Sequence, residues 1–222
     1  MADHDCKQDD RKQIRNRSLD ELGDQIASPN LHVGGGTAAA AAASLAAAAA
    51  ELVVALTARR ASAAEHEATV RMDLDRLRSL REELTAAGDQ DEAALDRLMD
   101  SYKKKLSSRS ELLVGAARTT LDIAKKSTEV IQIAARQVPL ASRFTASDLG
   151  ASASIARGAA TAGLLTAQIN IQLLEKDSNA VHQIVEELRA SAAEIDRIGR
   201  EEYDLALNAT YRRIAPGKKG EA

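Results

Sequence analysis

The sequence predicts an all-α protein: a single-domain bundle of about six or seven helices, several of them long. Aromatic residues make up only 2% of the 222 residues, whereas β-strands favour aromatic and β-branched side chains. The hydrophobic fraction of 45% consists mainly of alanine with leucine, isoleucine and valine, and alanine and leucine are among the strongest helix formers. Glycine and proline are scarce, with 12 and 3 residues, so long helices can run uninterrupted.

Polar, charged stretches flank the predicted bundle. Residues 1–17 are mostly charged or polar, and the tail 214–222 is rich in glycine and lysine. Segments of this composition bury too little apolar surface to fold. We therefore expect a disordered N-terminus over 1–17, one helical domain over 18–213, and a disordered tail over 214–222.

Capping residues and glycines mark the first helices. Ser18 with Glu21 three residues later is a capping box, so a short helix is expected to begin there. Thr37 follows a glycine triplet and is a candidate N-cap for a second helix. No glycine or proline occurs from 37 to 87. That stretch is too long for one ordinary helix, so we expect a bend or break near 58–64.

The later helices follow from punctuation and periodicity. Gly88 is expected to end the second helical stretch, and Asp89 to cap the next helix. Pro139 closes a further helix, and Thr145 caps one made of small residues. Apolar residues at helical spacing mark the buried faces. The expected ranges are about 108–137, 146–174 and 178–213, with stripes formed by Val70, Leu74, Leu77, Leu80 and Leu84 and by Val181, Ile184, Val185, Leu188, Ala192, Ile195 and Ile198.

Composition argues against nucleic-acid binding and against a membrane span. The formal net charge is −3 and few aromatic rings are present, so no basic stacking surface is expected. The alanine-rich run 37–58 is only weakly apolar, contains Glu51, and is followed by Arg59 and Arg60. We expect a buried helix there, packed closely against its neighbours, and no contact with nucleic acid or membrane.

The N-terminus and the cysteine content indicate the compartment. Residues 1–17 lack the apolar core of a signal peptide. The single cysteine, Cys6, cannot form an internal disulfide, which fits a reducing compartment. The expected location is therefore the cytoplasm.

The chemistry-bearing residues point to few kinds of site. The four histidines, at 4, 32, 66 and 182, are scattered, and no His or Cys cluster has the spacing of metal ligands, so no metal site is expected. Gly34, Gly35 and Gly36 follow no strand and precede no Walker lysine, which argues against a P-loop or a Rossmann turn. They leave backbone N–H groups open at a helix N-terminus, which suits a carboxylate or phosphate. The alternative is a flexible loop between helices.

Several short motifs occur in a defined order over about residues 18–212. They are Ser18-Leu19-Asp20-Glu21-Leu22, Ile26-Ala27-Ser28-Pro29, Gly34-Gly35-Gly36-Thr37, Leu52-Val53-Val54-Ala55-Leu56-Thr57, Asp91 with Ala94, Tyr102-Lys103, Val138-Pro139-Leu140, Ser147-Asp148 and Ile169-Asn170-Ile171. In this order they resemble the cyclodeaminase/cyclohydrolase family. That family includes the cyclodeaminase domain of formiminotransferase-cyclodeaminase and single-domain methenyltetrahydrofolate cyclohydrolases.

The resemblance implies a cyclodeaminase-like all-α fold and a homodimer whose substrate cleft lies near the helix interface. It also implies chemistry on the one-carbon unit of a small-molecule substrate, a tetrahydrofolate derivative. Either water opens the methenyl ring to give 10-formyltetrahydrofolate, or a formimino group cyclises with loss of ammonia. The reacting carbon is already electrophilic, so a carboxylate can move the proton between nitrogen and water, with no metal or redox cofactor.

Asp91 and Asp148 are the candidate catalytic carboxylates on this resemblance. Leu95, Leu98 and Tyr102 follow Asp91 at helical spacing, so Asp91 shares the face that is expected to turn inward. Partial burial there would raise its carboxyl pKa. The alternative for Asp91 is a solvated acid in the first turn of a helix, and the alternative for Asp148 is an N-terminal cap.

The remaining candidates would bind substrate. On the resemblance, the glycine triplet and Thr37 hold the glutamate tail or the pterin edge, and Arg59 meets the carboxylates unless it is a solvated helix end. Asn170 bonds the pterin or serves as a buried amide between helices, and Ser147 acts similarly or caps a helix. His32 supplies an acid/base group or is an exposed loop histidine. The candidate substrate-binding residues are Gly34, Gly35, Gly36, Thr37, Arg59, Tyr102, Ser147, Asn170 and His32.

Several positions depart from the family pattern and bear on the substrate. His32-Val33 stands where the family has Thr-Pro, Ala55 and Thr166 stand where it has asparagines, and Leu95 where it has phenylalanine. Three functions are therefore weighed. The first is a folate cyclohydrolase or cyclodeaminase, the second is the same scaffold acting on a non-folate imine or amidine in a biosynthetic pathway, and the third is a non-catalytic helical binding scaffold.

Overall fold

The computed structural model describes residues 12–29, 32–60, 65–104, 109–177 and 182–215, and this part of the chain contains no strand. It forms α1 (Leu19–Ala27), α2 (Gly35–Ala58), α3 (Glu67–Lys104), α4 (Arg109–Gln137), α5 (Ala146–Asp177) and α6 (His182–Ile214), with the 3₁₀ turns η1 (Ile14–Asn16) and η3 (Val138–Leu140). The expected all-α class, with about six helices, is confirmed.

The outer boundaries of most helices agree with the sequence prediction. The expected break is confirmed because α2 ends at Ala58 and α3 begins at Glu67, and α6 extends to Ile214, one residue into the expected tail. Some expected features lie outside the described residues: Cys6, the helix starts at 108 and 178, the segment 61–64 and the tail from 216.

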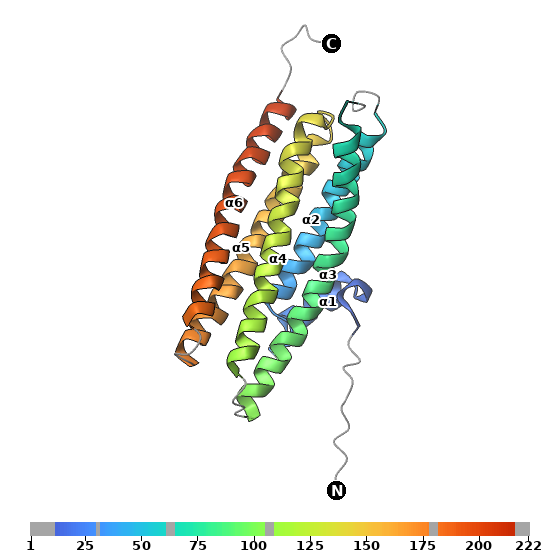
Figure 1. The fold of residues 1–222 in the computed structure, drawn as a ribbon. Coiled ribbons are helices and arrows are strands. Elements are labelled where there is room, and N and C mark those ends of the chain that lie inside the picture. Colours follow the sequence, from blue (N-terminus) through green and yellow to red (C-terminus); the bar gives the residue numbers. More distant parts are fainter. Residues whose placement is uncertain (1–11, 30–31, 61–64, 105–108, 178–181, 216–222) are drawn as a thin grey trace.

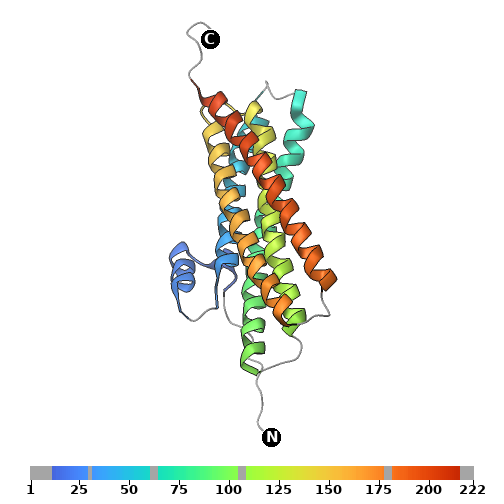
Figure 2. The ribbon, with the colours of Figure 1, turned by 90° about the vertical axis from the view of Figure 1, so that its left-hand side faces the viewer.

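The long helices form an antiparallel bundle (Figure 1). α2 packs against α3 and α5, and α4 packs against α3, α5 and α6. α1 lies outside the bundle, beside the beginning of α2 (Figure 2). Successive long helices run in opposite directions, so the first turn of α2 lies beside the second halves of α3 and α5.

Small side chains let these helices approach closely. On α2, Ala40, Ala43 and Ala47 have no exposed surface, and the distance between packed helices depends on the side chains at the contact. Ser152 on α5 donates a hydrogen bond from its hydroxyl to the Ala46 carbonyl of α2 at 2.7 Å. The alanine-rich run therefore packs closely against its neighbours on its inward face, as the sequence predicts.

The outward face of α2 is different. Among the described residues, α2 is the one helix that is long and apolar enough to cross a membrane. Its Glu51 pairs with Arg78 and Arg81 of α3, with N–O distances of 3.2 Å. Leu45 and Leu52 are 63% and 56% exposed. Glu51 thus pairs α2 with α3, whereas Leu45 and Leu52 are exposed to solvent in a single chain.

α3 continues through Gly88, where the sequence predicted an end, and that prediction is wrong. A Cβ at Gly88 would overlap the Ile14 side chain, so the glycine provides room for a packed residue and does not break the helix. Asp89 accepts a hydrogen bond from the Ile14 N–H at 2.8 Å instead of capping a new helix. Thr37 likewise lies inside α2, whose N-cap is Gly34.

Residues 12–17 pack on the bundle, so the predicted disorder of the N-terminus is wrong for this part. Ile14 in η1 is only 8% exposed and packs with α1 and with the loop before α2. The predicted capping box of α1 is confirmed: the Glu21 N–H donates to Ser18 Oγ at 3.1 Å, and the Ser18 N–H donates to the Glu21 carboxylate at 2.7 Å. Hydrogen bonds from Lys12 and Ser18 lower the pKa of Glu21 to about 2.

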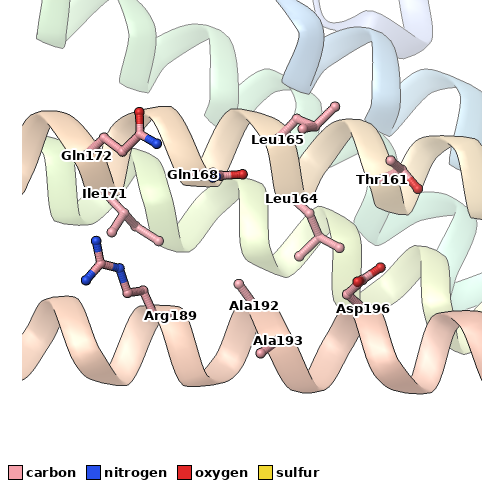
Figure 3. Close-up of a pocket in the computed structure, with 10 residues that line it drawn as sticks. All are labelled: Thr161, Leu164, Leu165, Gln168, Ile171, Gln172, Arg189, Ala192, Ala193 and Asp196. Atoms are coloured by element: carbon pink, nitrogen blue, oxygen red, sulfur yellow. The ribbon is translucent and has the colours of Figure 1, made fainter.

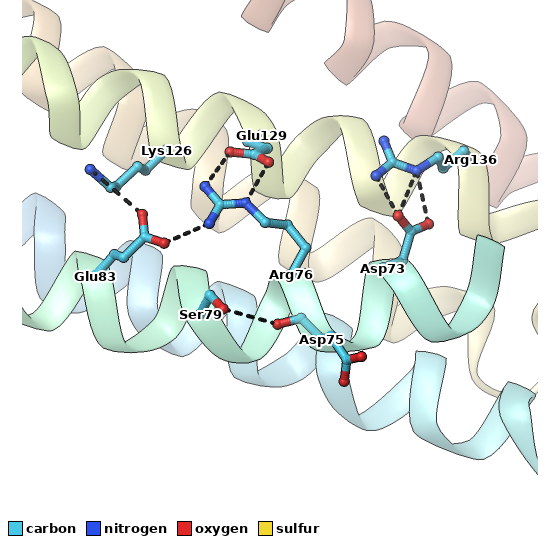
Figure 4. A network of polar contacts seen from close by, with 8 residues as sticks. All are labelled: Asp73, Asp75, Arg76, Ser79, Glu83, Lys126, Glu129 and Arg136. Atoms are coloured by element: carbon cyan, nitrogen blue, oxygen red, sulfur yellow. Dashed lines mark hydrogen bonds and ion pairs between the residues drawn. The ribbon is translucent and has the colours of Figure 1, made fainter. Parts of the chain in front are cut away.

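A network of ion pairs joins α3 to α4 (Figure 4). Asp73 has no exposed surface and accepts hydrogen bonds from Arg136 Nε at 2.8 Å and from Gln137 Nε2 at 2.6 Å. Arg76 donates from Nε and Nη2 to Glu129, each at 2.7 Å. This guanidinium lowers the pKa of the Glu129 carboxyl. The buried carboxylate is paired, as burial of a charge requires, and the network holds α3 against α4.

Replacing Gly163 by alanine should destabilise the bundle. A Cβ at Gly163 on α5 would lie 2.9 Å from the Thr120 carbonyl oxygen of α4, and a helix backbone cannot turn away as a flexible side chain can. We expect the free energy of unfolding, measured by urea denaturation, to fall by about 1–3 kcal/mol. Gly158→Ala on the same helix is the matched control. Nothing lies within 4 Å of its Cβ position, so alanine there should raise stability by up to about 1 kcal/mol. Equal losses in both variants would contradict the close contact.

Candidate active site

The candidate site lies where the beginning of α2 meets α3. Gly35, Gly36 and Thr37 form the first turn of α2 after the N-cap Gly34. Asp91 on α3 faces this turn and is 7% exposed. Thr37 Oγ1 donates a hydrogen bond to Asp91 Oδ2 at 2.9 Å, and the Thr37 backbone N–H also donates to this carboxyl. The positive end of the α2 dipole therefore meets a buried carboxyl group.

Gly36 permits this contact because it has no side chain. A Cβ at Gly36 would lie 2.5–2.6 Å from the carboxyl atoms of Asp91, closer than atoms can pack. A Cβ at Gly35 would instead lie at an ordinary contact distance of 3.6 Å from Thr166 Oγ1 of α5. Gly35 and Gly36 are helical, so the alternative of a flexible loop is wrong for them. Gly36 therefore serves the close approach of α3 to α2, and Gly35 faces α5 at an ordinary distance.

The surroundings of Asp91 favour its protonated form. Burial raises the pKa of the carboxyl above its usual range, and the neighbouring charge of Glu92 also raises it, while the hydrogen bonds from Thr37 act in the opposite direction. A carboxyl with a raised pKa exchanges its proton nearer to neutral pH than a free aspartate does, which suits general acid–base chemistry. The predicted inward orientation of Asp91 is confirmed.

α5 adds two polar side chains beside the glycines. Thr166 lies next to Gly35, and its hydroxyl donates to the Ala162 carbonyl at 3.0 Å. Asn170, one turn further along α5, is 8% exposed. No hydrogen bond joins the Asn170 amide to another described residue, so its donors and acceptor remain available. Thr166 therefore borders the glycine turn, and Asn170 lies one helical turn from Thr166 on α5.

The second candidate carboxylate is not part of this region in a single chain. Ser147 and Asp148 are exposed in the first turn of α5. Asp148 precedes Thr166 by 18 residues, which is about 27 Å along a helix that rises 1.5 Å per residue. Arg59 is the exposed C-cap of α2, about 36 Å from the glycines by the same measure. One chain therefore does not combine Asp91 with Asp148 or Arg59.

Tyr102 and His32 also lie apart from Asp91. Tyr102 is near the end of α3, where the Arg109 guanidinium stacks 4.5 Å from the centre of its ring. His32 is exposed, and its Nδ1 lies 2.9 Å from Asp96 Oδ1. This pair ties the loop before α2 to α3. Tyr102 and His32 therefore contact Arg109 and Asp96, respectively, and not the candidate acid Asp91.

The sequence analysis missed a buried ion pair beside Asp91. Glu92 accepts hydrogen bonds from Arg17 Nη1 at 2.6 Å and from Nη2 at 2.8 Å. The Arg17 and Glu92 side chains are only 3% and 5% exposed. Their 75-residue separation, and the polar character of the segment around Arg17, left no periodic signal that connects them.

A separate cavity of about 360 Å³ lies between α5 and α6, with Arg189 and Asp196 at its edge (Figure 3). Its charged groups already have partners: Arg189 pairs with Glu175 at 2.6 Å, and Asp196 with Arg157 at 2.8 Å. Within the described residues, no three His, Cys, Asp or Glu side chains gather in a way that would hold a metal ion. The chemistry therefore favours the Asp91 region over this cavity as the active site.

The chain is thus a helical-bundle protein with a buried acid at a helix N-terminus. Comparison with known proteins gives its family. The sequence profile of formiminotransferase-cyclodeaminase matches residues 18–190, so the chain belongs to that family. Its fold is similar to the crystal structure of formiminotetrahydrofolate cyclodeaminase from Thermotoga maritima, with a TM-score of 0.73 and 18% sequence identity over 90% of this chain and 97% of that one. Among curated proteins, none matches this chain in sequence.

Alanine at Gly36 should disturb Asp91, and alanine at Gly35 should not. The added methyl group of Gly36→Ala overlaps the Asp91 carboxyl, whereas that of Gly35→Ala makes an ordinary contact with Thr166. We expect urea denaturation to show a loss of about 1–3 kcal/mol for Gly36→Ala and a change within about 0.5 kcal/mol for Gly35→Ala. A larger loss for Gly35→Ala than for Gly36→Ala would contradict the described contact.

Proposed function

We propose that the protein is an enzyme of one-carbon folate chemistry, a formiminotetrahydrofolate cyclodeaminase or a methenyltetrahydrofolate cyclohydrolase, with Asp91 as its acid and base. The observation that carries the proposal is the Asp91 carboxyl, which is buried and has a raised pKa at the N-terminus of α2. The family of the chain and its similarity in fold to a formiminotetrahydrofolate cyclodeaminase support the proposal.

Both reactions need a group that releases and takes up a proton. In the cyclohydrolase reaction, water adds to the methenyl carbon and one C–N bond breaks. One proton of the water passes to the released nitrogen, and the other leaves to solvent. In the cyclodeaminase reaction, a neighbouring N–H nitrogen attacks the formimino carbon and loses its proton. The formimino nitrogen takes up two protons, one replacing that lost by the attacking nitrogen and one from solvent, and leaves as ammonia when its C–N bond breaks. Asp91 suits either reaction because burial raises the pKa of its carboxyl above that of a free aspartate, which makes it a better proton donor and acceptor for general acid–base catalysis.

The residues around Asp91 suit the recognition of such a substrate. The first N–H groups of a helix have no partner within the helix, so the turn at Gly35 and Gly36 offers donors to a carboxylate or to the polar edge of a pterin. Asn170, one turn from Thr166 on α5, offers a buried amide without a hydrogen-bond partner among the described residues. The methenyl carbon is cationic, so the proposed chemistry needs no metal or redox cofactor.

Titration with 5,10-methenyltetrahydrofolate, followed by its absorbance decay, tests the proposal. We expect binding and faster hydrolysis at neutral pH, and a loss of about 10²–10⁴-fold in rate for Asp91→Asn. Ammonia release from 5-formiminotetrahydrofolate, measured in parallel, identifies the preferred reaction. Asp100→Asn is the matched control, because Asp100 is an exposed acid on the same helix that pairs with Lys104 at 3.3 Å, and it should keep full activity.

Two outcomes would overturn parts of the proposal. Absence of binding and of catalysis with both folates would exclude a folate substrate, and Asp91-dependent activity on a non-folate amidine would then favour the recruited scaffold. Full activity of Asp91→Asn on either folate would remove Asp91 from the mechanism.

We also propose that two copies of the chain form a homodimer through the outward faces of α2 and α5. Besides Leu45 and Leu52 on α2, α5 exposes Ile155 by 45% and Leu165 by 62%. The two helices pack directly against each other, and we propose that these side chains form one apolar strip. A strip of this kind marks a surface that another molecule covers.

The positions of the candidate residues support a second copy as the cover. Asp91 lies near the start of α2, whereas Arg59 lies at the end of α2 and Asp148 at the beginning of α5. A two-fold axis across the middle of α2 pairs each α2 with an antiparallel copy, so the end of one helix meets the start of the other. The completed site would then contain Asp91 of one subunit with Arg59 and Asp148 of the partner subunit.

Light scattering after gel filtration tests this assembly. The chain should elute as a dimer, and Leu45→Glu should give monomers because it buries a charge in the strip. Met72→Glu is the matched control, since Met72 is 60% exposed on α3 outside the strip. A monomeric chain that binds phospholipid vesicles through Leu45 would overturn the proposal and assign the strip to a membrane.

A further inference from the structure

Residues 12–17 form a strap that crosses α3 at the turn carrying Asp91. The Ile14 N–H donates to Asp89 at 2.8 Å, and the Ile14 side chain occupies the space above Gly88. Two adjacent residues of α3 thus bind the strap: Gly88 leaves room for the Ile14 side chain, and Asp89 accepts the hydrogen bond from its N–H. The strap is therefore packed into the bundle and held at a fixed position along α3.

The strap places a cation on the acid next to Asp91. The Arg17 guanidinium binds both carboxylate oxygens of Glu92, and its Nε donates to the Lys12 carbonyl at 2.7 Å. Glu92 is 4% exposed, so without Arg17 it would be a buried carboxylate with no compensating charge. Asp91 and Glu92 are adjacent buried acids, and among the residues that the structure describes only Glu92 has a cationic partner.

We propose that Arg17 is a positioning residue of the active site: by pairing with Glu92 it neutralises the charge beside Asp91 and holds the α3 turn against the first turn of α2. The inference rests on the proposed catalytic role of Asp91. Arg17 acts through Glu92 and touches no reacting group. The division of roles is therefore that Asp91 moves the proton and Arg17 sets the electrostatic surroundings in which it does so.

Glu92 is the charged group near Asp91 through which the strap acts, because the other groups near Asp91 are neutral or are paired elsewhere. α2 contributes the Thr37 hydroxyl and N–H, and the part of α5 that borders the glycine turn carries the neutral residues Thr166 and, one turn further, Asn170. Asp89 is engaged by the strap backbone, and Asp96 by His32. Removing the Arg17 cation leaves an unneutralised negative charge next to Asp91, and removing the Glu92 charge takes that influence away. The two changes should therefore act on Asp91 in opposite directions.

A carboxyl ¹³C NMR titration of the full chain, with the Asp91 signal assigned from Asp91→Asn, measures this effect. The Asp91 pKa should rise in Arg17→Gln, fall in Glu92→Gln, and fall below that of Arg17→Gln in the double variant. Arg15→Gln is the matched control: Arg15 is an exposed cation of the same strap with no contact to Glu92, and it should leave the Asp91 pKa unchanged.

The titration is independent of substrate, so the proposal and the proposed function fail separately. Unchanged Asp91 pKa values, or shifts in the same direction for Arg17→Gln and Glu92→Gln, overturn the positioning role even if the enzyme acts on folates. If folate activity is found, the acidic limb of its pH profile should move with the Asp91 pKa in each variant. A limb that stays in place while the Asp91 pKa moves also overturns the role. Should Arg17→Gln fail to fold, Glu92→Gln and the double variant decide the question: the Asp91 pKa should be lower in Glu92→Gln, which keeps the Arg17 cation, than in the double variant, and equal values overturn the role.

Discussion

The structure depends on the close approach of helix backbones that alanine and glycine make possible. α2 buries a row of alanines without exposed surface, Gly163 lets α5 reach the α4 backbone at Thr120, and Gly36 admits the Asp91 carboxyl to the first turn of α2. Large side chains at these points would push the helices apart. The same constraint that packs the core therefore also shapes the candidate site, because the acid is buried only as long as α2 and α3 stay close.

Burial of Asp91 opposes stability and, in the proposed function, supports proton transfer at the same time. Taking a carboxylate out of water is unfavourable, and α3 places two acids in succession at Asp91 and Glu92. The two acids differ in how their burial is compensated. Glu92 receives a bidentate guanidinium, while Asp91 receives from the described part of the chain the hydroxyl and N–H of Thr37 and no cation. A structural acid is satisfied in this way, and its neighbour retains the raised pKa that a proton-transfer group uses.

Local signals in the sequence predicted most of the fold and part of the site. Periodicity, the capping box at Ser18 and the proline after α4 gave the helices because each depends on neighbouring residues. The helix end predicted at Gly88 was wrong, because a glycine that makes room for a packed residue and a glycine that ends a helix look the same in the sequence. Only the contact with Ile14 distinguishes them. Asp91 was placed inward from its own helix face. The distance between Asp91 and Asp148, and the pairing of Arg17 with Glu92, depend on how helices far apart in the sequence pack, and no local pattern contains that information.

The pairing of Arg17 with Glu92 also bears on where this domain begins. The family profile starts at residue 18, directly after the strap, so a boundary drawn from sequence similarity removes the cation and keeps the buried anion. A chain cut there would retain all six helices and the glycine turn. It would also carry the buried Glu92 carboxylate without its cation. The segment that the family profile recognises is therefore shorter than the segment in which the buried charges are paired.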